Sequence, residues 1–118
     1  METVKLFDSE LKIMDIIWEK EPISAKEISL IAADAIGWNK NTTYTIIKKL
    51  IEKKVIKRDE PNFICTTLIK KEAVRKAETQ SLINKLYNGS KKAFFAAFID
   101  DELSEDELNE LKKLIEKR

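Results

Sequence analysis

Near the N-terminus, apolar residues recur with the 3.6-residue period of an α-helix. The positions concerned are Leu11, Met14, Ile17 and Trp18. Ser9 lies just before them, and its hydroxyl is expected to cap this first helix. A second helix is expected after Pro22, because Ser24 and Glu27 have the spacing of a capping box, and it should end at residues 36–38.

A third helix is expected from Asn39 or Asn41 to about Lys54, and it has two distinct faces. The residues that point inward are Thr43, Ile46, Ile47, Leu50 and Ile51. Those that point outward are Asn41, Thr42, Thr45, Lys48 and Lys49, with Tyr44 at the border. Threonine loses side-chain freedom in a helix, so the outward threonines indicate a demand other than helix stability.

Two short runs rich in β-branched and aromatic residues follow, at residues 55–58 and 63–68. Asp59, Pro61 and Asn62 lie between them, and these residue types are typical of turns. The pattern predicts a β-hairpin with a short acidic tip.

The remainder of the chain predicts three helices, the first from Ile69 to Tyr87 and the others beginning after Ser90 and Ser104. Their apolar stripes are too extensive to be buried within about 50 residues, so we predict that they pack against a second copy of the chain. The residues predicted to form this dimer interface are Ile83, Leu86, Tyr87, Phe94, Phe95, Phe98, Leu108, Leu111 and Ile115.

These elements predict a mainly α-helical fold with a small β-hairpin. Residues 1–69 would form an N-terminal domain, and residues 70–118 a C-terminal three-helix dimerisation domain. A length of 118 residues suits one compact domain, or one small domain with an oligomerisation arm, and not a large enzyme. Two Gly and two Pro are too few for a many-stranded sandwich or barrel.

Histidine is absent and Cys65 is the single cysteine, which excludes imidazole bases, the usual zinc clusters and an internal disulfide. The acidic pairs at 100–101 and 106–107 resemble a carboxylate dyad, but favourable charge at a helix N-terminus explains them adequately. No Gly-rich phosphate loop or nucleophile elbow occurs. We therefore expect no enzyme activity, no metal and no cofactor.

No apolar run approaches the roughly 20 residues that cross a bilayer, and the N-terminus is acidic and polar where a signal peptide would be basic and then apolar. We expect no membrane insertion and a cytoplasmic location.

The formal net charge of +1 conceals a strong segregation of charge. Residues 40–58 carry 7 basic and 1 acidic side chains, whereas residues 93–118 carry 4 basic and 8 acidic ones. A solvated surface of mixed charge is seldom sorted in this way, so residues 40–58 are a candidate binding surface for a polyanion.

Three helices followed by a hairpin, with a polar and basic outer face on the third helix, is the layout of a winged helix-turn-helix domain. In that fold Asn and Thr on the third helix reach base edges in the major groove, while Lys neutralises phosphates. The residues expected to contact double-stranded DNA are Asn39, Lys40, Asn41, Thr42, Tyr44, Thr45, Lys48, Lys49, Lys57 and Arg58.

Two other interpretations stay open at this point. A lysine-rich helix face is often only solvated surface. A winged helix can also serve as a protein–protein interaction module without sequence-specific DNA binding, and DNA binding that depends on both salt and sequence distinguishes the two functions.

Three segments, residues 9–18, 37–50 and 103–111, carry a family resemblance in their order and spacing. The first contains Ser-Glu-Leu and Ile-Ile-Trp, the second Gly-Trp-Asn-Lys-Asn-Thr-Thr-Tyr-Thr, and the third Leu-Ser and Asp-Glu-Leu. Together they resemble the BlaI/MecI/CopY family, in particular its penicillinase and methicillin-resistance repressors, over nearly the whole chain.

The resemblance implies a homodimeric repressor that binds a pseudo-palindromic operator and blocks a β-lactamase or cell-wall-stress operon. It also implies inactivation by a sensor-linked protease that cuts the C-terminal region. The bond between Ala97 and Phe98 matches the family's cleavage pattern best. Cutting there would break the link between two half-site contacts and lower the affinity for the full operator.

The chain departs from the family pattern in two places. The copper-responsive relatives carry a C-terminal cysteine cluster that this chain lacks, so metal sensing of that kind is not expected. The family also tends to place Gly where Lys54 stands, so a left-handed turn at this position would cost about 1 kcal/mol unless another loop shape replaces it.

Overall fold

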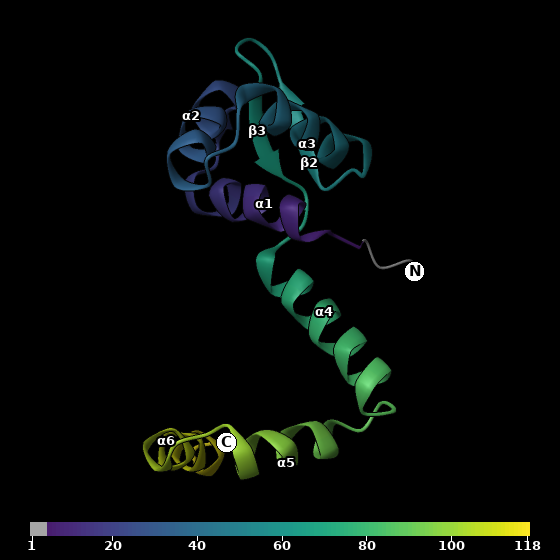
Figure 1. Ribbon diagram of the computed structural model, residues 1–118, viewed down its shortest axis with the longest axis vertical. Coiled ribbons are helices and arrows are strands. Elements are labelled where there is room, and N and C mark those ends of the chain that lie inside the picture. The colour runs from purple at the N-terminus through teal and green to yellow at the C-terminus, as the bar shows by residue number, and fades with distance from the viewer. Residues whose placement is uncertain (1–4) are drawn as a thin grey trace. The chain divides into compact units, whose positions relative to one another are not determined.

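The computed structural model describes residues 5–118, and the chain divides into two compact units, Met1–Arg75 and Lys76–Arg118. The first unit contains α1 (Asp8–Lys20), β1 (Ile23–Ser24), α2 (Ala25–Ala35), α3 (Lys40–Glu52), β2 (Ile56–Asp59) and β3 (Ile64–Thr67) (Figure 1). Helix α4 (Lys71–Leu86) begins in the first unit and continues into the second, which also holds α5 (Lys91–Asp101) and α6 (Glu105–Glu116). The predicted fold class, mainly α with a small sheet, is confirmed.

Helices α1, α2 and α3 and the sheet enclose the core of the first unit (Figure 1). The large side chains buried most completely are Ile13, Met14, Ile17, Ile28, Ile47, Leu50, Val55 and Ile56. Each such side chain contributes roughly 1.5–3 kcal/mol on burial. Because α1 and α3 both supply several of them, the core fixes the position of α3 against α1.

The two faces of α3 agree with the prediction. Thr43, Ile46, Ile47 and Leu50 are buried, and Ile51 is half-buried against the core. The residues predicted to point outward are exposed, and Tyr44 is half-buried at the border.

Helix α1 begins at Asp8 with Phe7 as its N-cap, so the prediction that Ser9 caps it was wrong. The backbone N–H of Phe7 donates a hydrogen bond to Glu10 Oε1 at 2.8 Å. The buried carboxylate of Glu10 therefore satisfies the helix start that was assigned to the Ser9 hydroxyl.

The other predicted serine caps are confirmed, although within residues 5–118 the capping box predicted for Ser24 and Glu27 forms only its serine half. Ser24, Ser90 and Ser104 accept hydrogen bonds from backbone N–H groups of α2, α5 and α6, at 3.1, 3.0 and 3.2 Å. At α3 the cap is Asn39 rather than Asn41, because Asn39 Oδ1 accepts from the backbone N–H of Thr42 at 2.8 Å.

The predicted hairpin is present as β2 and β3, which pair antiparallel with Arg58 opposite Cys65. Strand β1 was not predicted. It pairs antiparallel with the other edge of β3, which gives the order β1-β3-β2. Two residues, Ile23 and Ser24, carry no alternation that a sequence pattern could reveal.

The chain between α3 and β2 turns through a left-handed residue at Lys54, whose φ is 62°. Lys54 N donates to Ile51 O at 3.0 Å, and Val55 N donates to Leu50 O at 3.2 Å. The turn that the resemblance associates with Gly therefore forms here with a lysine, at the conformational cost that its Cβ imposes.

Candidate nucleic-acid interface

The outer face of α3 presents polar and basic side chains to solvent. Asn41, Thr42, Thr45, Lys48 and Lys49 are all exposed. Within residues 5–118, neither Lys48 nor Lys49 forms an ion pair with a carboxylate. The face therefore keeps uncompensated positive charge that an anionic partner can neutralise.

The first turn of α3 is held by its own polar side chains. Besides accepting from Thr42 through its side chain, Asn39 accepts a hydrogen bond from the Thr43 hydroxyl to its backbone carbonyl, at 3.3 Å. Asn39 therefore has a structural role as the cap, in addition to any contact with a ligand. The ammonium of Lys40 lies 5.7 Å from the centre of the Tyr44 ring.

The Thr45 side chain carries a hydroxyl group and a methyl group, and the hydroxyl is already hydrogen-bonded within the helix. Its hydroxyl donates to the backbone carbonyl of Asn41 at 2.8 Å, one helical turn earlier. This bond fixes the side chain and uses the hydroxyl proton, which leaves the methyl group and the hydroxyl oxygen, as an acceptor only, for a ligand. A threonine held in this way is suited to an apolar contact, such as the methyl group of thymine.

A shallow hollow of about 400 Å³ runs along this face. Its lining residues are Ser9, Asn39, Asn41, Thr42, Thr45, Ile46 and Lys49. Ser9, from the first turn of α1, was not among the predicted site residues. Its sequence context indicated a helix cap, and only the packing of α1 on α3 brings it to this surface.

The two predicted basic contacts of the hairpin are both paired with acidic neighbours. Lys57 Nζ lies 3.4 Å from Asp59 Oδ2, and Arg58 forms a salt bridge with Glu60. The side chains of consecutive strand residues leave opposite faces of a sheet. Arg58 lies opposite the buried Cys65, so it is on the face toward the core, whereas Lys57 is on the other face.

An aromatic contact joins the hairpin to α3. The ring of Phe63 meets that of Tyr44 edge to face, with 5.9 Å between their centres. The guanidinium of Arg58 lies 3.6 Å from the centre of the same Phe63 ring. Phe63 therefore positions Arg58 beside α3, a role that its place in a strand-like run did not reveal.

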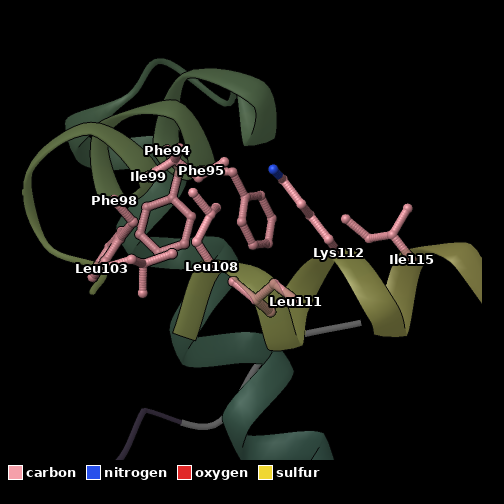
Figure 2. A pocket seen from close by; sticks show the side chains of 9 residues that line it. All are labelled: Phe94, Phe95, Phe98, Ile99, Leu103, Leu108, Leu111, Lys112 and Ile115. Atoms are coloured by element: carbon pink, nitrogen blue, oxygen red, sulfur yellow. The ribbon is translucent and has the colours of Figure 1, made fainter. Parts of the chain in front are cut away.

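The second unit has an exposed apolar surface. Figure 2 shows side chains of α5 and α6 converging on a hollow of about 720 Å³. The residues that line it are Phe94, Phe95, Phe98, Ile99, Leu103, Leu108, Leu111, Lys112 and Ile115. Six of them belong to the predicted dimer interface, and Phe95 and Ile115 are 56% and 71% exposed.

The three other residues predicted at that interface lie outside this hollow. Ile83 is buried, Leu86 is 69% exposed, and the half-buried Tyr87 meets Phe94 edge to face with 5.4 Å between ring centres. The bond proposed for cleavage, between Ala97 and Phe98, lies inside helix α5.

Other chemistry is sparse among residues 5–118. In the part of the chain that the structure describes, no three His, Cys, Asp or Glu side chains come together as a metal site would require, and no helix is long and apolar enough to cross a membrane. Burial raises the pKa of the Cys65 thiol to about 11, against a smaller lowering by Arg58, so the thiol stays protonated at neutral pH.

The three helices, the paired β2 and β3 and the polar, basic outer face of α3 define a winged helix-turn-helix protein. The chain belongs to the penicillinase repressor family, because the sequence model described as penicillinase repressor matches residues 6–117. This confirms the resemblance noted in the sequence. The family is one of repressors, not enzymes.

Individual relatives extend over almost the whole chain. A penicillinase repressor of Staphylococcus aureus is 30% identical over 115 residues, covering 95% of this chain and 91% of that protein. The penicillinase repressor of Bacillus licheniformis is 27% identical over 115 residues, with coverage of 95% and 90%. The methicillin resistance regulatory protein MecI of Staphylococcus aureus is 29% identical over 119 residues, with coverage of 98% and 97%.

Among solved structures, the DNA binding domain of the repressor BlaI has a similar fold. Its solution structure matches with a TM-score of 0.56 and 24% identity, over 62% of this chain and 93% of that chain. At this identity, the likeness is evidence of fold alone.

Proposed function

We propose that the chain is a dimeric transcriptional repressor that binds double-stranded operator DNA through α3. The observation that carries the proposal is the outer face of α3, where exposed Asn, Thr and Lys side chains lack carboxylate partners within residues 5–118. Amide and hydroxyl groups read base edges in the major groove, and ammonium groups bind phosphates.

The proposed role of each side chain follows from which of its groups are available to contact DNA. Asn41 and Thr42 are exposed at the start of α3 and would reach base edges, together with the Thr45 methyl group. Lys48 and Lys49 would bind phosphates flanking the groove. Asn39, Lys40 and Tyr44 would support this surface at its border, through the helix cap and the packing of Lys40 on Tyr44.

The hairpin would add a phosphate contact beside α3. Arg58 is the proposed contact, because Phe63 holds its guanidinium on the side of the sheet that faces α3. Lys57 leaves the opposite face of the strand, so its proposed role is a longer-range contribution to the positive field.

A second copy of the chain would cover the apolar hollow between α5 and α6. Soluble monomers rarely expose connected apolar surface of this kind, with Phe95, Phe98 and Ile115 all open to solvent. We assign residues 1–69 to DNA binding and residues 70–118 to dimerisation. Two linked DNA-binding domains require an operator of two half-sites, which a pseudo-palindrome provides.

By analogy with the relatives named penicillinase repressor and methicillin resistance regulatory protein, the regulated genes would form a β-lactamase or cell-wall-stress operon. The repressor itself would act in the cytoplasm. A sensor-linked protease would inactivate the repressor at Ala97-Phe98. That bond lies within α5, so cutting requires local unwinding. Since α5 has no buried residue, such unwinding disrupts little packing within the chain.

A winged helix that contacts only proteins is the alternative. It would bind DNA weakly and without sequence preference. Gel-shift titration of a full inverted repeat and of a single half-site tests the proposal directly, with Phe94→Asp as the variant that disrupts the dimer and Leu30→Asp as a control at an exposed leucine of α2.

We expect the wild type and Leu30→Asp to bind the full repeat at least tenfold more tightly than the half-site, because linkage makes the second contact intramolecular. Phe94→Asp should lose that advantage and sediment as a monomer. Equal affinity of the wild type for both duplexes, or an unchanged dimer mass for Phe94→Asp, would contradict this dimer.

A further inference from the structure

Both cations of the β2–β3 hairpin are neutralised by carboxylates of the same hairpin. Lys57 pairs with Asp59, and Arg58 pairs with Glu60. Both pairs are solvent-accessible, with every partner about half exposed. These four side chains together therefore carry no net charge, although Lys57 and Arg58 belong to the basic segment 40–58.

The two pairs have different surroundings. Lys57 and Asp59 lie two residues apart, on the face of the sheet that points away from the core. Arg58 lies on the other face, stacked on Phe63, which in turn contacts Tyr44 of α3. Only the Arg58–Glu60 pair is thus placed beside the candidate DNA surface.

The stacking on Phe63 occupies one flat side of the Arg58 guanidinium and leaves its edge available for hydrogen bonds. In the free protein, the carboxylate of Glu60 binds that edge through Arg58 Nε. A phosphate oxygen offers the same acceptor chemistry. The Phe63 ring is also held by its contact with Tyr44, so Arg58 has a second support when the carboxylate is displaced.

We propose that Glu60 competes with the DNA phosphate for Arg58 and so weakens the sequence-independent part of DNA binding. This inference rests on the proposed function. Each duplex must displace Glu60 to gain the Arg58 contact, whatever its sequence, whereas base contacts from α3 are unaffected. Glu60 therefore shifts the source of affinity from phosphate binding toward base recognition.

The test compares Glu60→Gln with Asp59→Asn in the full-length chain. Each substitution removes one negative charge from the same hairpin, and only the first frees Arg58. Gln can keep an oxygen for the backbone N–H of Phe63, which Glu60 Oε2 accepts at 3.4 Å. The probe is a random-sequence duplex, titrated at several salt concentrations.

For Glu60→Gln we expect about two- to fivefold tighter binding to the random duplex, the range for releasing an exposed ion pair. The plot of log affinity against log salt should steepen by up to about 0.9, because wild-type complexes that keep the Arg58–Glu60 pair lack one phosphate contact that Glu60→Gln gains. Asp59→Asn should change both quantities less. In an Arg58→Gln background, Glu60→Gln should no longer tighten binding beyond the Asp59→Asn effect.

Equal increases in affinity for Glu60→Gln and Asp59→Asn would mean that the effect comes from net charge alone, which would overturn the inference. So would an unchanged affinity for Glu60→Gln, or a full gain that survives in the Arg58→Gln background. If the wild type prefers its operator but Glu60→Gln behaves like wild type, this inference alone fails. If neither protein binds any duplex, the proposed function fails and takes this inference with it.

Discussion

Lys53 Nζ lies 2.6 Å from Glu10 Oε1, so a salt bridge joins the C-cap of α3 to the first turn of α1. The side chain of Glu10 is 2% exposed and that of Lys53 is 28% exposed. Lys53 also donates to the backbone carbonyl of Lys5 at 3.0 Å, and its ammonium lies 4.6 Å from the centre of the Phe7 ring. This set of contacts fixes the end of α3 and thereby the orientation of its outer face.

Lys53→Met should lower the free energy of unfolding by about 2–4 kcal/mol, because it leaves the buried carboxylate of Glu10 without its counter-ion. The double variant with Glu10→Gln should recover part of the loss. Urea denaturation measures both. Lys48→Met, on the exposed face, is the control and should change stability by less than about 0.5 kcal/mol. Additive losses in the double variant would mean that the two side chains do not interact.

Lys54→Gly should raise the free energy of unfolding by about 1 kcal/mol, because glycine adopts the left-handed conformation without the Cβ penalty. Lys48→Gly, in the interior of α3, should lower the free energy of unfolding by about 1 kcal/mol. Thermal unfolding of the two variants gives the comparison. A loss of stability on Lys54→Gly would show that the left-handed turn is absent in solution.

Substitutions of Thr45 distinguish a contact by its methyl group from a contact by its hydroxyl, which is hydrogen-bonded to the backbone of Asn41. Thr45→Val keeps the methyl, and Thr45→Ser keeps the hydroxyl. We expect Thr45→Ser to weaken operator binding about fivefold, and to do so at one base pair, while Thr45→Val stays close to wild type. Gel shifts on a panel of single base changes measure this. The reverse order would assign the contact to the hydroxyl.

The raised pKa of Cys65 predicts a specific pH dependence of stability. Between pH 9.0 and about 11, the thiol of the unfolded chain loses its proton while the buried thiol keeps its own. The folded state then binds more protons than the unfolded state, so stability falls as pH rises through this window. Cys65→Ala lacks this contribution. The stability of the wild type relative to Cys65→Ala should therefore decline across the window, and a constant difference would argue against burial of the thiol.

Much of the winged helix could be predicted from the sequence because the decisive signals are local. Helical periodicity placed Thr43 and Leu50 on the inward face of α3 and Lys48 on its outward face. A Ser at the N-cap position located the starts of α2, α5 and α6. Both signals depend only on residues within a turn or two of one another.

The features that were missed depend on contacts between segments that are distant in the sequence. From the sequence alone, Glu10 is an acidic residue at a helix start and Phe63 is the first residue of a predicted strand. Their roles come from distant partners, which are Lys53 for Glu10 and both Tyr44 and Arg58 for Phe63. Ser9 joined the candidate interface for the same reason. Neither periodicity nor spacing records such contacts.

Recognition of a particular DNA sequence by the outer face of α3 distinguishes an operator-binding repressor from a module that binds only proteins. A nuclease footprint of the full-length protein on the DNA upstream of its own gene, with excess random duplex and at two salt concentrations, tests this most directly. We predict protection of a short inverted repeat whose half-sites lie on one side of the DNA, about 10 base pairs apart or a multiple of that distance. The protection should survive the competitor at both salt concentrations. Loss of all protection in the presence of the competitor would contradict the account and favour a module that binds proteins.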